Sequence, residues 1–484
     1  MANNPKLKPI SQELIIDRIK YENPWWISGC IDDDYNKMRR RIYFDLFFPL
    51  VEETDIKRAV VLMGSRRVGK TVMMHHVIDK LLEKGINKHN LCYIGLDNPV
   101  YLNMHLEELF SLSREAAGNS NPKEWFVFFD EIQYLKDWEV HLKVMVDSYP
   151  HTKFVVSGSA AAALKFKSTE SGAGRLTEFM LPSLTFHEYI HLKNYSDLIR
   201  PAQNQWSGNL KNFFTTINIK EINRHFIDYI NFGGYPEVIF SEKIQADPRR
   251  YIKSDIIDKV LLRDLPGLYG IQNVQELNAF FTTLAWYSGN EMSLDNLSRS
   301  SGVEKNLLKK YLEYLEAAFL IKIVHRIDDT AKKFRRATFY KIFLTNPSFR
   351  SALFSPLQPT DEAIGNMVET AIFTQWLYND QFTPWYARWR TGKFKGEVDM
   401  VGLDNKNFKP QWAMEIKWSN RYWEKPGELK SLIRFCKINN LKSAMVTSID
   451  KEGIIQHDGV ELYFYPSAMY AYSVGVNTTE QKTP

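Results

Sequence analysis

Eight consecutive residues, Gly64 to Thr71, have the types and the spacing of a loop that binds phosphate groups. They read Gly-Ser-Arg-Arg-Val-Gly-Lys-Thr, which satisfies the pattern G-x-x-x-x-G-K-[ST]. Glycines at both ends let consecutive backbone N–H groups turn inward around a polyphosphate. Lys70 would reach the β- and γ-phosphates, and the Thr71 hydroxyl would hold Mg²⁺. The pattern predicts a nucleoside triphosphate site formed by Gly64, Ser65, Arg66, Arg67, Val68, Gly69, Lys70 and Thr71.

Two adjacent carboxylates follow an apolar run at Trp125–Phe129, namely those of Asp130 and Glu131. The carboxyl ends of buried parallel strands are where an α/β nucleotide site collects its catalytic groups. Asp130 would hold the water shell of Mg²⁺, and Glu131 would polarise the attacking water. On its own, an Asp-Glu pair after an apolar run can also cap the next helix.

Two further segments could complete this site. A predicted strand at Lys153–Val156 leads into Ser157-Gly158-Ser159, where Ser157 could contact the γ-phosphate or the water; an ordinary turn is the alternative. Arg175, which follows a glycine, could neutralise transition-state charge in its own chain or across a subunit interface, or be a surface residue.

A second group of chemically capable residues lies near the carboxyl end of the chain. Asp399 lies in a strand-like run at Glu397–Leu403, and Glu415 and Lys417 lie in another at Trp412–Trp418. Residues two apart on a strand point to the same face, so Glu415 and Lys417 should sit side by side. Asp399, Glu415 and the Ile416 carbonyl would bind Mg²⁺ or Mn²⁺, and Lys417 would position or deprotonate a water. Glu369, on a predicted helix, would reach the metal through water or orient Lys417.

The elements around these residues follow from hydrophobic patterning. An apolar run at Ala59–Met63 precedes the phosphate loop and a helical pattern at Val72–Leu82 follows it, whereas a chance glycine-rich turn would need neither. Phe186–Val260 is expected to be helical. Helical patterns at Gln275–Ser288 and Glu304–Ala317, then a strand at Leu320–His325, are typical of a winged helix.

The predicted winged helix carries basic residues that could contact DNA phosphates. Lys305 and Lys309 lie one turn apart on its second helix, and Lys332–Arg336 is a basic stretch interrupted by one phenylalanine. Such domains also serve as packing modules, and charges on one helix face are often simply solvated.

Composition is that of a globular protein with several domains. The chain has 484 residues, of which 44% are hydrophobic, 25% charged and 14% aromatic, with a net charge of +5. Its three cysteines have no metal-like spacing, so a reducing compartment is expected. No apolar run is long enough for a membrane span, and a cytoplasmic location is predicted.

The stretches VVLMGSRRVGKT, FFDEIQYLKDWEVHLKVMVD, FVVSGSAAA and GRLTEFMLPSLTFHEY resemble a family of bacterial and archaeal AAA+ ATPases. NFGGYPEVIF and WRTGKFKGEVDMV are similar to later landmarks of that family, although Ser65 stands where proline is common. The resemblance implies an α/β fold in four parts: an ATPase core (1–185), a helical lid (186–260), a winged helix (261–340) and a C-terminal domain (341–484). Glu369, Asp399 and the Glu-x-Lys at 415–417 resemble a PD-(D/E)-x-K nuclease core.

These observations lead to one preferred interpretation and two alternatives. The preferred one is a cytoplasmic ATPase that uses ATP and Mg²⁺ to control a nuclease-like domain acting on DNA. The first alternative is a switch whose C-terminal domain binds nucleic acid or protein without cleaving it; the second is a metabolic or transport NTPase. A homo-oligomer is left open.

Overall fold

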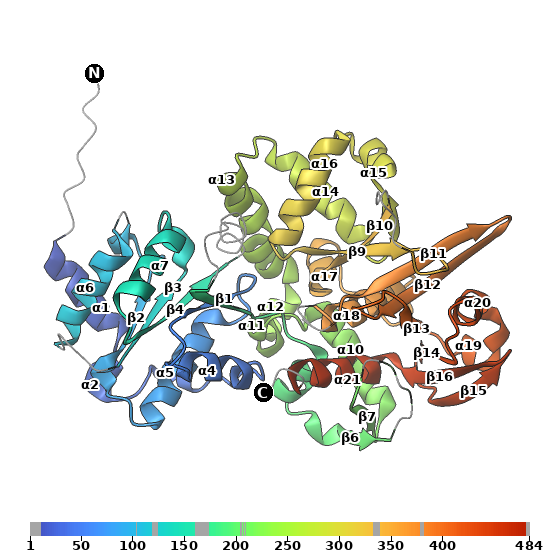
Figure 1. Cartoon of the computed structure of the whole chain (residues 1–484), viewed down its shortest axis with the longest axis horizontal. Coiled ribbons are helices and arrows are strands. Elements are labelled where there is room, and N and C mark those ends of the chain that lie inside the picture. Colours follow the sequence, from blue (N-terminus) through green and yellow to red (C-terminus); the bar gives the residue numbers. More distant parts are fainter. Residues whose placement is uncertain are drawn as a thin grey trace. The chain divides into compact units, whose positions relative to one another are not determined.

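The computed structural model describes residues 11–480 apart from 103, 119–123, 160–173, 204–205, 207, 209, 333–338 and 378–381. The chain forms two compact units, Met1–Leu181 and Pro182–Pro484, each with its own sheet (Figure 1). The division falls close to the predicted end of the ATPase core. Among the described residues, no helix has the length and apolar character needed to cross a membrane.

The first unit is built on a five-stranded parallel sheet with the order β2-β3-β4-β1-β5. Strands β1, β2 and β3 are wholly buried, which explains why they read as continuous apolar runs rather than alternating ones, whereas β5 is partly exposed. The strands are β1 (Ala59–Met63), β2 (Leu91–Gly95), β3 (Trp125–Asp130), β4 (Thr152–Gly158) and β5 (Leu176–Met180). The helices include α1 (Gln12–Glu22), α2 (Trp25–Ser28), α3 (Asp33–Asn36), α4 (Phe44–Glu52), α5 (Lys70–Glu83), α6 (Leu106–Ala117) and α7 (Trp138–Ser148).

Strand β1, which leads into the predicted phosphate loop, lies between β4 and β5 in this sheet. It is hydrogen-bonded to β4 on one side and to β5 on the other, so that Met63 is opposite both Gly158 and Met180. All five strands run the same way, and the segments that follow β1, β3 and β4 therefore emerge at one edge. The predicted α/β fold with a parallel sheet is confirmed.

The second unit contains a nine-stranded mixed sheet with the order β15-β16-β14-β13-β12-β11-β9-β10-β8. Its strands are β8 (Glu291–Ser293), β9 (Ile321–Ile327), β10 (Phe339–Leu344), β11 (Trp385–Thr391), β12 (Phe394–Leu403), β13 (Pro410–Glu415), β14 (Ser443–Ser448), β15 (Gly453–His457) and β16 (Val460–Pro466). Apolar side chains from the sheet and its helices form two buried clusters, one including Met400 and Met414 and the other including Val401 and Ala413. Because successive strand residues face opposite ways, this sheet is packed on both faces.

Helices precede, interrupt and follow these strands along the chain of the second unit. They include α9 (Phe186–Leu192), α10 (Ile219–Phe232), α11 (Pro236–Phe240), α12 (Glu242–Ala246), α13 (Leu265–Tyr269), α14 (Val274–Trp286), α15 (Leu294–Ser301), α16 (Lys305–Ala317), α17 (Ser348–Leu353), α18 (Ile364–Gln375), α19 (Arg421–Glu424), α20 (Lys430–Ile438) and α21 (Ser467–Glu480), with π-helical stretches at Arg249–Asp258 and Val260–Asp264. The segment expected to be wholly helical also contains an antiparallel hairpin, β6 (Ile199–Ala202) and β7 (Phe213–Thr216). The hairpin strands are short, four residues each, and a run of that length has too few residues to distinguish a strand from a helix by periodicity.

The elements predicted as a winged helix are joined to the C-terminal strands in one sheet. Ser293 caps α15 by accepting the N–H of Asn296, and α16 and β9 follow in the expected order. Strand β9 then pairs in parallel with β11, with Arg326 opposite Tyr386. The predicted boundary at 340/341 falls inside β10, and most of the basic stretch at 332–336 lies outside the described residues.

Candidate functional site

The phosphate loop lies between β1 and α5, as predicted, and both of its glycines are sterically required. A Cβ atom on Gly64 would lie 2.4 Å from the Leu181 carbonyl oxygen, which is closer than non-bonded atoms approach. Gly69 has a φ of 98°, a left-handed value that a side chain disfavours, and the helix begins at the next residue. The loop is thus shaped by close backbone packing at one end and a left-handed turn at the other.

Lys70 is folded back into the loop. Its Nζ donates to the carbonyl oxygens of Gly64 at 3.1 Å and Ser65 at 3.0 Å, and the residue is only 5% exposed. Burial lowers the pKa of its ammonium, while the nearby carboxylates of Glu131 and Asp130 act in the opposite direction. An anion placed in the loop would add further counter-charge next to this buried ammonium.

Asp130 is the centre of a hydrogen-bond network at the end of β3. Thr71 Oγ1 donates to its Oδ2 at 2.6 Å, and Ser157 Oγ donates to its Oδ1. A hydroxyl and a carboxylate held together beside a phosphate loop fit Mg²⁺, which is usually bound by one or two carboxylates plus substrate phosphates. Thr71, Asp130 and Ser157, three residues of the predicted site, are therefore brought together; Ser157 contacts Asp130, and its contact with a γ-phosphate or water stays a prediction.

Tyr93, on β2, is a member of this network that sequence reasoning missed. Its hydroxyl donates to Asp130 Oδ2 at 2.8 Å. A single tyrosine in the apolar run Leu91–Gly95 was the available signal. Its partner could be found only once β2 and β3 were known to be neighbours, because that pairing sets Gly95 opposite Asp130.

Glu131 has a strained backbone and a fixed carboxylate. Its φ of 56° is left-handed, and its N–H donates to Ser157 Oγ at 3.1 Å. Gln133 donates to its carboxylate and also accepts the N–H of Ser159 at 3.2 Å. The carboxylate predicted to polarise water is thus tied to the turn at the end of β4.

Arg175 is placed away from the phosphate loop. It immediately precedes β5, which runs parallel to β1 with Leu176 opposite Ala59, and so lies at the amino edge of the sheet. The length of β5 separates the two edges by about 16 Å at the rise of a strand. Its Nε donates to both oxygens of Asp147 at 2.8 Å. This position does not support a role for Arg175 at the nucleotide site of its own chain.

Arg41, which was not singled out from the sequence, supports the phosphate loop from outside. Its guanidinium donates to the Val68 carbonyl oxygen at 2.7 Å, and the residue is 6% exposed. Of the two arginines within the loop, Arg67 is exposed and has a left-handed φ of 63°, while Arg66 is half-buried.

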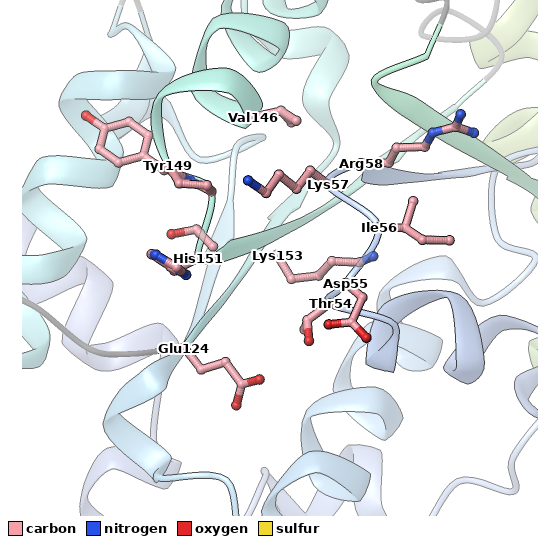
Figure 2. Close-up of a pocket in the computed structure, with 12 residues that line it drawn as sticks. Thr54, Asp55, Ile56, Lys57, Arg58, Glu124, Val146, Tyr149, His151 and Lys153 are labelled. Atoms are coloured by element: carbon pink, nitrogen blue, oxygen red, sulfur yellow. The ribbon is translucent and has the colours of Figure 1, made fainter.

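A hollow of about 160 Å³, shown in Figure 2, is lined in part by residues that precede or begin β1, β3 and β4, at the amino edge of the parallel sheet. Its lining includes Lys57, Tyr149 and Lys153. Burial lowers the pKa of Lys153 to about 8, and its ammonium donates to the Glu53 carbonyl oxygen at 2.5 Å. The hollow is remote from Asp130 and Glu131, which lie at the carboxyl end of β3.

In the second unit, Asp399, Glu415 and Lys417 converge as predicted. Lys417 Nζ lies 2.8 Å from Asp399 Oδ2 and 2.6 Å from Glu415 Oε2. Asp399 Oδ2 also accepts the Ile416 N–H at 2.9 Å. The expected reason for this contact was wrong, because β13 ends at Glu415 and Lys417 lies beyond the strand.

The charges of this site perturb one another strongly. Burial raises the pKa of Glu415 well above its usual range, and the adjacent Asp399 carboxylate adds to the effect. Burial also opposes ionisation of Asp399, but the ammonium groups of Lys417 and Lys341 outweigh it and hold the pKa of Asp399 below its usual range. Burial raises the pKa of Glu369 to about 7. Such separation of neighbouring carboxyl pKa values is typical of functional sites.

Two carboxylates of this site fit a divalent cation. Asp399 and Glu415 lie side by side and are each 6% exposed. Among the described residues, no three or more His, Cys, Asp or Glu side chains are arranged as a metal cage. Glu369 instead pairs with Lys341 at 2.8 Å. The donor set is therefore a carboxylate pair, which suits Mg²⁺ or Mn²⁺ completed by water, and does not include Glu369 as a third direct ligand.

Comparison with known proteins agrees with the fold of the first unit. Residues 56–190 match a family described as an AAA domain, and residues 223–360 match a domain of unknown function. The parallel sheet, the phosphate loop and this match together define the first unit as a P-loop α/β fold of the AAA+ type.

The relatives of the chain are uncharacterized proteins. One from Methanocaldococcus jannaschii is 25% identical over 58% of this chain and 60% of its own length, so the match spans less than two thirds of that relative. One from Haemophilus influenzae is 25% identical over 86% of this chain and 95% of its own length. Similar solved structures include the Aeropyrum pernix ORC1 protein in complex with DNA, with a TM-score of 0.32 and 11% identity over 68% of this chain and 95% of that one. AMPPCP-bound DnaA from Aquifex aeolicus has a TM-score of 0.27 and 11% identity over 65% of this chain and 93% of that one.

Proposed function

We propose that this protein binds ATP with Mg²⁺, hydrolyses it, and uses that cycle to control a metal-dependent nuclease-like site in its second unit, with DNA as substrate. The observation that carries the ATPase proposal is the contact of Thr71 with Asp130, at 2.6 Å, beside a buried Lys70. These are the groups that Mg²⁺ and a polyphosphate require at one place.

In this proposal each residue of the first site has one task. The loop N–H groups and Lys70 bind the β- and γ-phosphates, while Thr71 and Asp130 hold the hydrated Mg²⁺, which neutralises charge on the phosphates when bound. Glu131 orients and polarises the attacking water, and Ser157 and Gln133 hold Glu131 and Asp130 in place. Arg175 could serve a neighbouring subunit if the protein is a homo-oligomer, because its guanidinium is at the surface.

The nuclease proposal rests on the convergence of Asp399, Glu415 and Lys417. Asp399 and Glu415 would bind Mg²⁺ or Mn²⁺, which when bound acts as a Lewis acid on a phosphodiester. The side chain of Lys417 is 26% exposed, so a water or a phosphate oxygen could approach it from solvent. Lys417 would then orient the attacking water.

The alternative of a switch that does not cleave DNA is favoured by a specific observation. Both carboxylates predicted to bind metal are already paired with lysine ammonium groups. A site whose lysines never release the carboxylates would keep the nuclease architecture and serve only for binding. The predicted winged helix supports a DNA partner through exposed Lys309 and Lys310 on α16, whereas Lys305 is paired with Asp295.

The ATPase proposal is tested by phosphate release with Mg²⁺, with and without plasmid DNA. The wild-type protein should hydrolyse ATP, and Lys70→Ala should lose at least about a hundredfold in rate, because it removes a charge that acts on the transferring phosphate. Lys80→Ala is the matched control, since Lys80 lies on the same helix and pairs at the surface with Glu83. Equal rates for the two variants would contradict the proposed site.

A further inference from the structure

A second lysine, Lys341, is buried within the carboxylate site of the second unit. It lies on β10, and its side chain is 3% exposed. Its Nζ lies 2.8 Å from Glu369, 3.0 Å from Glu397 and 3.5 Å from Asp399. A cation so deeply buried is tolerated only where carboxylates surround it. Lys341 therefore belongs to the electrostatics of this site, and it is the first residue of the predicted C-terminal domain (341–484).

Lys341 and Lys417 are not equivalent. The side chain of Lys417 is 26% exposed, whereas that of Lys341 is 3% exposed and stacks 5.6 Å from the centre of the Tyr386 ring. A macromolecular substrate can approach only the first of them. Lys341 is thus a positioning residue. It contacts Asp399, a proposed ligand of the cation, and does not contact the substrate.

The charges of the site leave room for a divalent cation. Four carboxylates, those of Glu369, Glu397, Asp399 and Glu415, face the two ammonium groups of Lys341 and Lys417. Burial favours a proton on Glu415, so a cation would bind with loss of that proton; with all four carboxyls then ionised, the excess is two negative charges. Arg388 lies 3.6 Å from Glu397 but is closer to Glu291, at 2.8 Å, so it completes a different pair.

We propose that Lys341 sets the affinity of this site for a divalent cation by competing with it for the shared carboxylate, Asp399. This inference rests on the proposed metal site. Lys341 lies on the Oδ1 side of Asp399 and Lys417 on the Oδ2 side. An ammonium a few ångströms from a bound cation repels it strongly where water is excluded.

The same contacts connect cation binding to Glu291, which lies in the segment predicted as the winged helix (261–340). Lys341 is opposite Glu291 of β8, which accepts the Tyr386 hydroxyl at 2.9 Å and pairs with Arg388 of β11. A shift of β10 relative to β12 would move the Lys341 ammonium with respect to Asp399. Any event that moves these strands would therefore change how tightly the site holds its cation.

The test is Mn²⁺ binding without nucleotide, measured by calorimetry and by the Mn²⁺-induced shift in Tm. Lys341→Gln should bind Mn²⁺ at least about tenfold more tightly than wild type, because one repelling charge is removed. The Tm of this variant should be lower in chelator and should rise more on addition of Mn²⁺. Lys322→Gln is the matched control, since Lys322 lies on β9 of the same sheet and pairs with Glu316. Equal or weaker Mn²⁺ binding by Lys341→Gln would overturn the proposal.

A second variant keeps the test decisive if Lys341→Gln does not fold. Lys341→Gln combined with Glu397→Gln removes one charge of each sign and still lacks the ammonium, so it should also bind Mn²⁺ more tightly than wild type. Asp399→Asn distinguishes the metal site from the role of Lys341. Mn²⁺ binding that is unchanged in Asp399→Asn would contradict the metal site itself. Binding that depends on Asp399 but not on Lys341 would contradict only the competition by Lys341.

Discussion

The hydroxyl of Thr71 and the carboxylate of Asp130, 59 positions apart in the chain, are joined by a 2.6 Å hydrogen bond. The contact exists because the loop after β1 and the end of β3 emerge at the same edge of a parallel sheet. It joins the group that should hold Mg²⁺ next to phosphate with the group that should hold its water shell. Variants at this contact, and at the second cluster around Asp399, should therefore have separable effects.

Replacement of Glu131 by glutamine should separate binding from turnover. The amide keeps the size of the side chain but cannot polarise water, so nucleotide affinity should stay near wild type while turnover falls by at least about a hundredfold. Binding of a fluorescent ATP analogue and phosphate release would be measured on the same preparation. Turnover that persists in Glu131→Gln would show that another group activates the water.

Tyr93→Phe should weaken the network around Asp130 without removing any ligand. Loss of one buried hydrogen bond is expected to cost about 1 kcal/mol in the free energy of unfolding. Because Tyr93 shares Asp130 Oδ2 with Thr71, the Mg²⁺ concentration needed for half-maximal ATP turnover should also rise. Tyr134→Phe, in the turn after β3, is the control. An unchanged Mg²⁺ requirement in Tyr93→Phe would place Tyr93 outside the functional network.

Arg175→Ala should leave ATP turnover unchanged in the dilute monomer. The residue lies at the amino edge of the sheet and pairs at the surface with Asp147, so its loss should alter turnover by no more than about twofold. Rates would be measured at low protein concentration, after the mass has been checked by light scattering with and without ATP. A large loss in the monomer would contradict this placement of Arg175.

His187 of α9 should make the second unit sensitive to acid. Burial, reinforced by nearby His191, lowers the pKa of His187 from 6.5 to about 3. Between these two pH values, the unfolded chain therefore binds a proton at His187 that the folded chain does not bind. The contribution of neutral His187 to the free energy of unfolding is fully present above about pH 6.5 and is lost as the pH falls toward 3. The loss amounts to about 2 kcal/mol at pH 5.

The variant His187→Gln should flatten this dependence between pH 6.5 and pH 4. Urea unfolding at several pH values would measure it, with the exposed His151 replaced by glutamine as the control. If the slopes of wild type and His187→Gln agree over this range, the protonation of His187 is not coupled to unfolding.

Features encoded in short stretches of sequence were the ones that could be predicted. The loop at Gly64–Thr71 is a contiguous pattern of restricted residue types, and Asp130 follows its own apolar strand, so recognising either does not depend on knowing the fold. Asp399 and Glu415 could be paired in advance because each lies in a recognisable strand and β12 and β13 are neighbours along the chain.

Features that depend on distant pairing could not be predicted. Tyr93 and Lys341 each appear as one polar residue in an apolar strand, and their roles follow from which strands lie beside them. The position of Arg175 depended on recognising Leu176–Met180 as a strand parallel to β1, because the start of such a strand lies opposite the phosphate loop. The union of β9 with β11 has no local signal at all.

Cleavage of supercoiled plasmid and branched DNA with Mn²⁺, with and without ATP, tests the central claim most directly. The account predicts that the wild type cuts DNA and that ATP changes the rate. Lys70→Ala should still cut DNA at a rate that no longer responds to ATP, and Asp399→Ala should not cut at all while it hydrolyses ATP normally. Absence of metal-dependent cleavage of either DNA by a wild-type protein that hydrolyses ATP would contradict the account and leave the switch as its replacement.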